Sequence, residues 1–491
     1  MAFWLVPALL KIALIAGVGL ASNTSDLQEC LTSSVSDVVF EGDLLYQATA
    51  VQRYNLNIPV SPAAVTSPEN AKEVAAVVKC ASDNGLSVQA RSGGHSFGNH
   101  GLGGSDGAVV VDLEKLQKFS MDESTWVATI GSGTLLGDVT TRLSDAGGRA
   151  MSHGTCPQVG SGGHFTIGGL GPTSRLFGTS LDHIVEVEAV LANSSIVRAS
   201  ETQNPDVFFA VKGAASSFAI VTEFKVRTQP EPEQAVQYSY SFTLGDTKRR
   251  ADLFKKWQAY VSQPDLSRKF ASVLTLLGDS IMISGTYLGS KAEYDALGIA
   301  DKFPGSNNSS TIVFDDWLGL VGHWAEDITL ELLGGIPAYF YSKSRAFTQE
   351  SLMSSSDADH MFEFIDNADK GTPVWFVIFD LAGGAVNDVP VDATAYSHRD
   401  VVFWLQSYAV NPLGEISQTT HDFLDRLNEL TAAGNVNDGL SYQAYPGYID
   451  PRLPNAQAAY WGSNLQRLER IKEDIDPKNV FRNPQSVHGQ P

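Results

Sequence analysis

The sequence predicts an α+β fold that is divided into more than one domain. From residue 54 to about residue 229, short runs rich in β-branched residues alternate with helix-like segments and glycine-containing turns. The segment Pro230-Glu231-Pro232-Glu233 then interrupts this pattern, and proline breaks helices and strands alike. A chain of 491 residues is also too long for one hydrophobic core. We therefore expect one domain before this break and another after it.

The part before the break contains alternating strands and helices. Helix-like segments lie at 69–84 and 135–145. Strand candidates lie at 63–65, 87–90, 108–112 and 126–130, within 184–197, and at 219–226. Such alternation is typical of layered α/β or α+β structure.

After the break, from about residue 235 to residue 438, strand-like runs mix with amphipathic helices. The strand candidates lie at 239–242, 271–277, 282–287, 338–341 and 375–381. No internal repeat and no low-complexity tract is visible.

Composition and charge exclude several classes of function. The formal net charge is −21 and the isoelectric point is about 4.8, so the phosphates of a nucleic acid would be repelled. The 10 histidines and 3 cysteines form neither an H-E-x-x-H nor a C-x-x-C pattern, and we expect no zinc or iron site.

The N-terminus predicts secretion. Residues 1–21 form an apolar run that ends in Gly19-Leu20-Ala21, which is typical of a cleaved signal peptide. A membrane anchor is the alternative, but Lys11 interrupts the run and no later segment approaches about 20 consecutive apolar residues. Passage through the secretory route would allow N-glycosylation. The four sequons begin at Asn23, Asn193, Asn307 and Asn308.

Two glycine-rich segments carry most of the chemical information. The first is R-S-G-G-H-S at 91–96, and the second is G-T-C-P-Q-V-G-S-G-G-H at 154–164. Glycines let the backbone approach a large planar ligand and donate N–H groups to its pyrophosphate. The imidazole of His95 and the thiolate of Cys156 are nucleophiles that can attach to an oxidised flavin ring.

These two segments resemble the vanillyl-alcohol-oxidase type of flavoprotein, within its berberine-bridge-enzyme and glucooligosaccharide-oxidase branch. The resemblance runs from about residue 30 to about residue 487. It implies FAD held by two covalent bonds, from His95 to the flavin 8α carbon and from Cys156 to C6. The other cofactor-binding residues that it implies are Arg91, Ser92, Gly93, Gly94, Ser96, Val159, Gly160, Gly162, Gly163 and His164.

The resemblance also implies the domain organisation. A PCMH-type FAD-binding domain of two α/β subdomains would span 22–230, after the signal peptide at 1–21. An antiparallel-sheet substrate domain covered by helices would span 231–438. A C-terminal segment at 439–491 would return to the FAD-binding domain.

Cys30 and Cys80 lie in helix-like stretches of the N-terminal region. A bridge between them would close a loop of about fifty residues, worth about 4 kcal/mol in the chain-entropy estimate. This bridge would leave Cys156 free for the flavin, although a buried Cys156 thiol with no cofactor bond is the alternative.

The resemblance assigns the catalytic residues as well. Tyr442-Gln443-Ala444-Tyr445 resembles the family's Y-x-N-Y segment, whose second tyrosine is the catalytic base, and Asp380 matches an aspartate that hydrogen-bonds this tyrosine. We therefore expect Tyr445 as the base and Asp380 as its partner. Ala444 departs from the family's asparagine, and the nearby Tyr448 is a second candidate. A phenol with a pKa near 10 is a poor base at neutral pH without such a partner.

The resemblance favours an oxidase that passes electrons to O2 and forms H2O2, since Val159 occupies a position where the family's oxidases keep valine. The first candidate substrate is an oligosaccharide oxidised at C1 to a lactone. The alternative is a small hydrophobic intermediate of polyketide or alkaloid biosynthesis, because fungal relatives of this family also serve such pathways. Phe97 and Ala444 leave a less polar site and favour this alternative. A flavin-holding protein with little turnover is a third hypothesis, and we expect a monomer.

Two other motifs point to different chemistry. Residues 94–98 match the G-x-S-x-G nucleophile elbow of serine hydrolases, which requires a helix directly after the serine. The glycines that follow at 101–104 do not readily start a helix. Residues 131–137 resemble the dinucleotide fingerprint, but the third glycine is displaced by one residue. We expect a tight strand-to-helix turn there and no nicotinamide cofactor.

Overall fold

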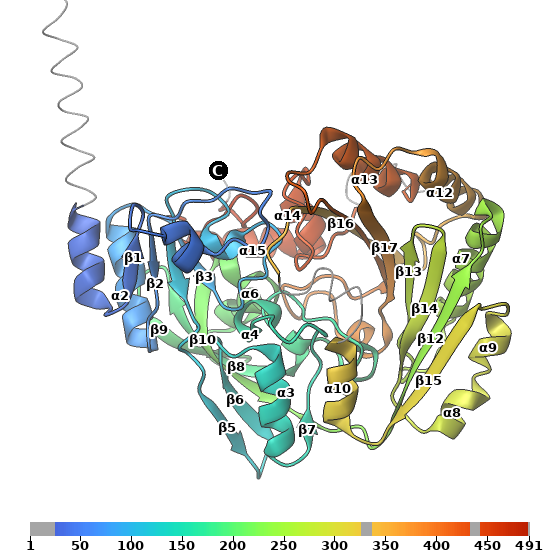
Figure 1. Ribbon diagram of the computed structural model, residues 1–491. Coiled ribbons are helices and arrows are strands. Elements are labelled where there is room, and N and C mark those ends of the chain that lie inside the picture. Colours follow the sequence, from blue (N-terminus) through green and yellow to red (C-terminus); the bar gives the residue numbers. More distant parts are fainter. Residues whose placement is uncertain (1–24, 326–335, 433–441, 490–491) are drawn as a thin grey trace, which may run out of the picture.

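The structure is a computed structural model that describes residues 25–325, 336–432 and 442–489. Two groups of sheets lie side by side (Figure 1). The predicted signal peptide at 1–21, the sequon at Asn23 and the predicted boundary at 438 lie outside the described residues. Among the described residues, no helix has the length and apolar character needed to cross a membrane.

The first unit contains a four-stranded sheet in the order β1-β2-β4-β3. Strand β1 pairs with β2 antiparallel, whereas β2, β4 and β3 are parallel. The helix α2 (Ala71–Asp83) joins β2 to β3, and the side chain of Asn70 caps its first turn. The four strands are β1 (Val38–Phe40), β2 (Ala64–Thr66), β3 (Val88–Arg91) and β4 (Val109–Asp112).

A five-stranded antiparallel sheet completes the first unit, in the order β5-β6-β10-β8-β9. The helices α3 (Leu136–Asp145) and α6 (Pro205–Ala214) supply buried side chains to the core beside it. The strands are β5 (Phe119–Asp122), β6 (Val127–Gly131), β8 (Ile184–Leu191), β9 (Ile196–Ser200) and β10 (Ala219–Arg227).

The second unit is built on a seven-stranded antiparallel sheet, in the order β15-β12-β14-β13-β17-β18-β16. Three helices, α7 (Thr247–Val261), α12 (Ser355–Asn367) and α13 (Gln418–Leu430), pack on one face of it. The strands are β12 (Ala235–Thr243), β13 (Val273–Leu277), β14 (Ser280–Tyr287), β15 (Asn308–Phe314), β16 (Phe340–Thr348), β17 (Val374–Leu381) and β18 (Val401–Val410).

Strand β17 shows how this sheet divides its side chains between two faces. Successive residues of a strand point to opposite sides. Val377, Phe379 and Leu381 join the core under the three helices. Phe376, Ile378 and Asp380 line a cavity on the other face. The helices therefore stabilise one face and leave the other for a ligand.

The C-terminal residues return to the first unit. The helices α14 (Ala456–Trp461) and α15 (Leu465–Ile475) share a core with α6. Lys472 of α15 is buried beside Asp476, and its ammonium donates to the carbonyls of Ser217 and Phe481 at 2.6 and 2.8 Å. This charge-assisted network fixes the chain end against the end of α6.

The sequence missed β1, β5, β15 and β18, and it misplaced β16. Every residue of β18 is buried, so the strand lacks the apolar–polar alternation of a half-buried strand. In β15, almost every residue is exposed. The strand predicted at 338–341 begins at Phe340 and continues to Thr348.

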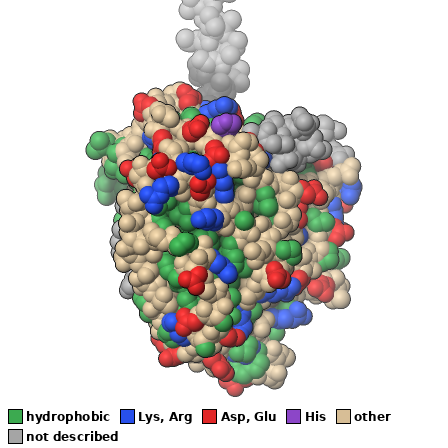
Figure 2. All heavy atoms as spheres, turned by 90° about the vertical axis from the view of Figure 1, so that its right-hand side faces the viewer, with side chains coloured by type: hydrophobic (Ala, Val, Ile, Leu, Met, Phe, Trp, Pro, Cys, Tyr) green, Lys and Arg blue, Asp and Glu red, His purple; other side chains and the backbone are tan. Residues whose placement is uncertain are grey.

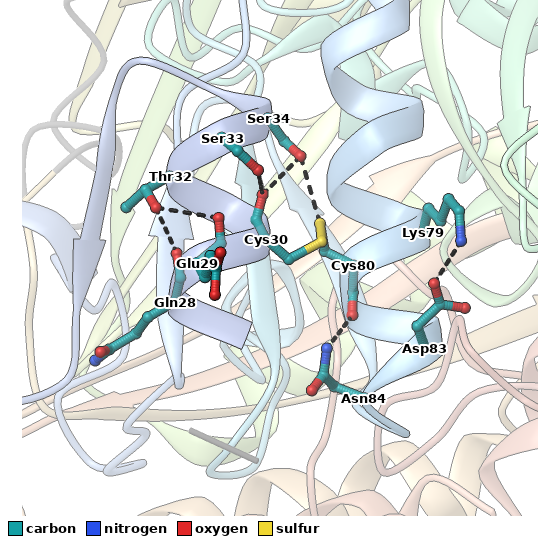
Figure 3. The surroundings of a disulfide bond; sticks show 10 residues. All are labelled: Gln28, Glu29, Cys30, Thr32, Ser33, Ser34, Lys79, Cys80, Asp83 and Asn84. Atoms are coloured by element: carbon teal, nitrogen blue, oxygen red, sulfur yellow. Dashed lines mark hydrogen bonds and ion pairs between the residues drawn. A yellow bond between two sulfur atoms is a disulfide. The ribbon is translucent and has the colours of Figure 1, made fainter. Parts of the chain in front are cut away.

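The predicted disulfide between Cys30 and Cys80 is present (Figure 3). It joins the helix at residues 25–34 to α2, with 5.7 Å between the two Cα atoms. Cys156 is a free thiol.

The remaining sequons lie on the surface. Asn193 is exposed in the turn between β8 and β9, and Asn307 and Asn308 are exposed at the start of the edge strand β15. Acidic and basic side chains are scattered over the outer face of the second unit (Figure 2).

Candidate active site

A cavity of about 580 Å³ lies between the first unit and the uncovered face of the seven-stranded sheet. Both glycine-rich segments line it, and so do residues of β17 and β18. The cavity also includes residues 481–486 of the returning C-terminal segment. Its walls therefore come from three parts of the chain that are far apart in the sequence.

The two glycine-rich segments lie backbone against backbone. A Cβ atom added to Gly93 would lie 2.4 Å from the backbone nitrogen of Gly160. One added to Gly160 would lie 2.0 Å from the hydroxyl of Ser92, which itself donates to the carbonyl of Ser132 at 2.6 Å. Only glycine fits at either position, so the sequence pattern here reflects a contact between the two segments as well as an approach to a ligand.

The side chain of Arg91 fixes the backbone of the first glycine-rich segment. Its guanidinium pairs with Asp112 on the neighbouring strand β4. It also donates to the carbonyls of Ala50 and Val51 at 2.7 and 2.6 Å. Arg91 lines the cavity, but these bonds show that its charge fixes the backbone that carries His95.

The two predicted attachment residues face the same cavity. Burial lowers the pKa of His95 to about 4, so its imidazole is neutral and can act as a nucleophile. Burial raises the pKa of the Cys156 thiol, and hydrogen bonds from the backbone of Gln158 and Val159 oppose this shift. A neutral imidazole and a free thiol in one cavity, beside a glycine cradle, fit the two-bond flavin attachment.

His164 and Ser96 support the loops around them. The ring nitrogen Nε2 of His164 accepts a hydrogen bond from the backbone of Gly154 at 2.9 Å, and burial lowers the pKa of His164 to about 3. The hydroxyl of Ser96 accepts from the backbone of His100 at 3.0 Å. The glycines Gly94, Gly162 and Gly163 and the side chain of Val159 also line the cavity.

The nucleophile-elbow alternative does not match the local structure. Ser96 follows β3, but the next helical element is a single short 3₁₀ turn, His100–Leu102. Gly131 and Gly133 lie against the backbone of residues 113–118, where a Cβ on Gly133 would be 1.8 Å from the carbonyl oxygen of Leu113. They allow a tight turn from β6 into α3.

Tyr445 is anchored to the first unit. Its hydroxyl accepts a hydrogen bond from the backbone of Gly169 at 3.0 Å, and its own backbone N–H donates to the hydroxyl of Ser344 at 3.1 Å. Burial raises its pKa to about 12. Its phenol is thus held by the backbone of the first unit.

Asp380 forms no hydrogen bond with Tyr445, contrary to the pairing predicted from the sequence, and none with Tyr448, but its charge acts on Tyr448 and not on Tyr445. Burial raises the pKa of Tyr448, and the charge of Asp380 raises it further. No such effect of Asp380 acts on Tyr445. Burial also raises the pKa of Asp380 to about 7. Both side chains line the cavity.

The sequence contained a signal for this correction. The spacing Y-x-x-Y occurs twice in overlapping frames, from Tyr442 to Tyr445 and from Tyr445 to Tyr448. The family's asparagine is absent in both, where Ala444 and Gly447 stand. The effect of the Asp380 charge, which acts on Tyr448 and not on Tyr445, separates the two frames.

A group of aromatic rings lies around Tyr448. Phe97 stacks on Tyr448, with 6.1 Å between ring centroids and 19° between planes, and on Tyr54 at 6.1 Å and 17°. Tyr408 packs its edge on Phe97 at 5.6 Å and stacks on Phe376 at 5.0 Å. Sequence reasoning missed Tyr54, Phe376 and Tyr408, although the alternation within 374–381 could have indicated Phe376.

Two family models match the chain. A model described as "FAD binding domain" matches residues 62–200. A model described as "Berberine and berberine like" matches residues 444–488. The first match contains both glycine-rich segments, and the second contains Tyr445 and Tyr448.

Known proteins resemble the chain over nearly its whole length. The FAD-linked oxidoreductase sorD of Penicillium rubens is 40% identical over 93% of this chain and 97% of its own. The xylooligosaccharide oxidase of Thermothelomyces thermophilus is 32% identical over 94% of each chain. Among solved structures, the glucooligosaccharide oxidase from Acremonium strictum has a TM-score of 0.85 and 30% identity over 95% of this chain and 99% of its own. The cofactor of that oxidase is a 6-S-cysteinyl, 8α-N1-histidyl FAD.

The two glycine-rich segments that line the cavity, the family models and these relatives lead to one assignment. The chain is an FAD-dependent oxidase, and it belongs to the berberine-bridge-like and carbohydrate oxidases of the PCMH-type FAD oxidoreductase family.

Proposed function

We propose that this chain is a secreted oxidase that oxidises a CH–OH group, with Tyr448 as the catalytic base and Asp380 as its partner. The observation that carries this proposal is that Asp380 and Tyr448 line the cavity that both glycine-rich segments also line, where the charge of Asp380 acts on Tyr448. FAD, when bound, supplies the hydride acceptor and the group that O2 reoxidises with formation of H2O2. Secretion rests on the predicted signal peptide at 1–21.

Tyr448 needs Asp380 because a buried phenol cannot ionise alone. Burial and the Asp380 charge both raise the pKa of Tyr448, so phenolate does not accumulate at neutral pH. Tyr448 can still accept the substrate's hydroxyl proton if it passes its own proton to Asp380 in the same step. A carboxyl with a pKa of about 7 is suited to receive this proton.

We propose that FAD is attached through both His95 and Cys156. The neutral imidazole and the free thiol support this attachment. The Acremonium strictum oxidase has its FAD bonded to the same two residue types, a cysteine and a histidine.

For the substrate, the relatives and the cavity favour different candidates. The names of the Thermothelomyces thermophilus and Acremonium strictum relatives favour an oligosaccharide oxidised at its anomeric carbon. The rings of Tyr54, Phe97 and Tyr408 near Tyr448 offer stacking surface and few polar partners. They favour the second candidate, a small hydrophobic alcohol of polyketide or alkaloid type.

A substrate panel separates these candidates. The purified oxidase is mixed without oxygen with cello-, xylo- and chito-oligosaccharides and with flat hydrophobic alcohols, and the flavin absorbance is followed. We expect bleaching by at least one compound and H2O2 on admission of air. Bleaching by sugars alone would remove the hydrophobic candidate, and no bleaching by any alcohol would contradict oxidation at CH–OH.

Replacing the base tests the choice between the tyrosines. Tyr448→Phe should slow anaerobic flavin reduction by about 10²-fold or more, as expected for loss of a general base. Tyr445→Phe is the comparison variant, and it should have a smaller effect because it removes the hydrogen bond that anchors the segment at Gly169 but keeps the phenol of Tyr448. A large loss in Tyr445→Phe with none in Tyr448→Phe would return the base to Tyr445.

The flavin bonds are tested by acid denaturation. We expect the yellow colour to stay with the precipitated polypeptide in the wild type, in His95→Ala and in Cys156→Ala, since each single variant keeps one bond. The double variant should release flavin into the supernatant. Release from the wild type would contradict covalent attachment, and release from one single variant would leave only one bond in the native enzyme.

The pH dependence tests Asp380. Its carboxylate is the proton acceptor, and its pKa is raised to about 7. The limiting rate of flavin reduction should therefore fall as the pH drops through about 7 and should level off above it. Asp380→Asn should be slow at every pH and lose this inflection. An identical inflection in Asp380→Asn would assign it to another group.

A further inference from the structure

The segment that carries both tyrosines has no helix or strand to hold it between residues 442 and 453. It runs along β16, which is an edge strand of the seven-stranded sheet. The backbone of Ala346 donates to the carbonyl of Gln443 at 3.0 Å. The hydroxyl of Tyr442 donates to the carbonyl of Ser344 at 2.8 Å. The edge of the sheet thus serves as the support for this segment.

Beyond Tyr448, the support becomes ionic. Asp450 is 3% exposed, and its carboxylate accepts hydrogen bonds from the ammonium of Lys343 and the hydroxyl of Tyr341, both at 2.9 Å. Lys343 and Tyr341 belong to β16. The carbonyl of Asp450 also accepts from the side chain of Gln485 at 2.7 Å.

The surroundings keep Lys343 charged. Burial alone would lower its pKa, but the charge of Asp450 and hydrogen bonds to Asp425 and Asp450 outweigh burial and raise the pKa. Asp425, on α13, accepts from Lys343 at 2.7 Å. The other groups around the cluster are His421, whose pKa is lowered by burial, and Arg452, 3.9 Å from Asp425. Lys343 therefore stays an ammonium over the working pH range.

Stability alone gives no reason for this arrangement. A buried ion pair contributes little net stability, because desolvation offsets the attraction, and well-packed apolar residues often replace such a pair without loss. An ion pair with several hydrogen bonds does fix the position of its atoms better than apolar packing.

We propose that Lys343 and Asp450 are positioning residues that hold the phenol of Tyr448 in place in the cavity that Asp380 also lines. Two interactions fix the chain on either side of Tyr448. Before it, the hydroxyl of Tyr445 accepts a hydrogen bond from Gly169 of the first unit. After it, the carboxylate of Asp450 pairs with Lys343 of the second unit. Asp380 sits on a regular strand, whereas Tyr448 does not. The ion pair gives the irregular segment a fixed place relative to the sheet. This inference rests on the proposed role of Tyr448 as base.

The test compares Lys343→Met with Lys343→Arg in the FAD-loaded enzyme. In Lys343→Met, the limiting rate of anaerobic flavin reduction should fall by about 10²-fold, which is the effect of a displacement of about 1 Å in a catalytic group. The substrate dissociation constant should change little, because the substrate-facing walls are untouched. Lys343→Arg should recover most of the rate, since a guanidinium can also pair with Asp450.

Hydrogen exchange of residues 444–453 gives a readout that does not depend on the reaction. It should become faster in Lys343→Met and stay close to wild type in Lys343→Arg. The matched control is Lys255→Met, which removes another ion pair of the second unit, 2.6 Å from Asp359, away from this segment. Lys255→Met should leave both the rate and the exchange of 444–453 unchanged.

The outcomes separate this inference from the proposed function. A Lys343→Met enzyme that reduces flavin at the wild-type rate, while Tyr448→Phe is slow, would overturn the positioning role and leave the base in place. If Tyr448→Phe is fast, the base assignment fails. Hydrogen exchange then still decides whether Lys343 holds the segment. Slow reduction in Lys255→Met as well would show a general effect of lost ion pairs and would also overturn the inference.

Discussion

The contact between the backbones of Gly93 and Gly160 is the constraint on which the rest of the site depends. The two segments follow different sheets of the first unit: the first follows β3 of the four-stranded sheet, and the second follows β7 (Arg149–Ala150), which pairs with β11 (Gln229–Pro230). A side chain at either glycine would push them apart, because the added Cβ would lie 2.4 Å from the nitrogen of Gly160 or 2.1 Å from that of Gly93. Without this contact, His95 and Cys156 would not face the same cavity.

The second constraint is the division of the seven-stranded sheet between its two faces. The helices α7, α12 and α13 pack on one face and bury its side chains. The other face can then carry Phe376 and Asp380 toward the cavity without loss of the core. A buried carboxylate is costly unless its pKa rises, and the stability supplied by the covered face allows Asp380 to be kept in such a place. The same strand thus serves folding through Phe379 and, in the proposed mechanism, proton transfer through Asp380.

The sequence predicted the fold class, the Cys30–Cys80 bond and most strands of the first unit, because these depend on local patterns and on spacing. It missed β18 because a strand buried on both faces has no period-2 signal. It paired Asp380 with Tyr445 because the Y-x-x-Y spacing repeats in overlapping frames, and spacing along an irregular segment does not fix where a side chain points. The network of Lys343 and Asp450 could not be foreseen either, since it joins residues 107 apart in the chain.

These features together explain why the proposed proton transfer needs help from outside the cavity. Transfer from Tyr448 to Asp380 requires both groups to keep one separation, and a displacement of about 1 Å costs about 10²-fold in rate. Asp380 is fixed by ladders to β13 and β18. Tyr448 lies on a segment with no ladder of its own, so its position depends on side-chain contacts to β16 and to Gly169. In the proposed mechanism the edge of the sheet therefore contributes to catalysis without touching the substrate, and the hydrogen bond from Gly169 to Tyr445 ties the same segment to the first unit.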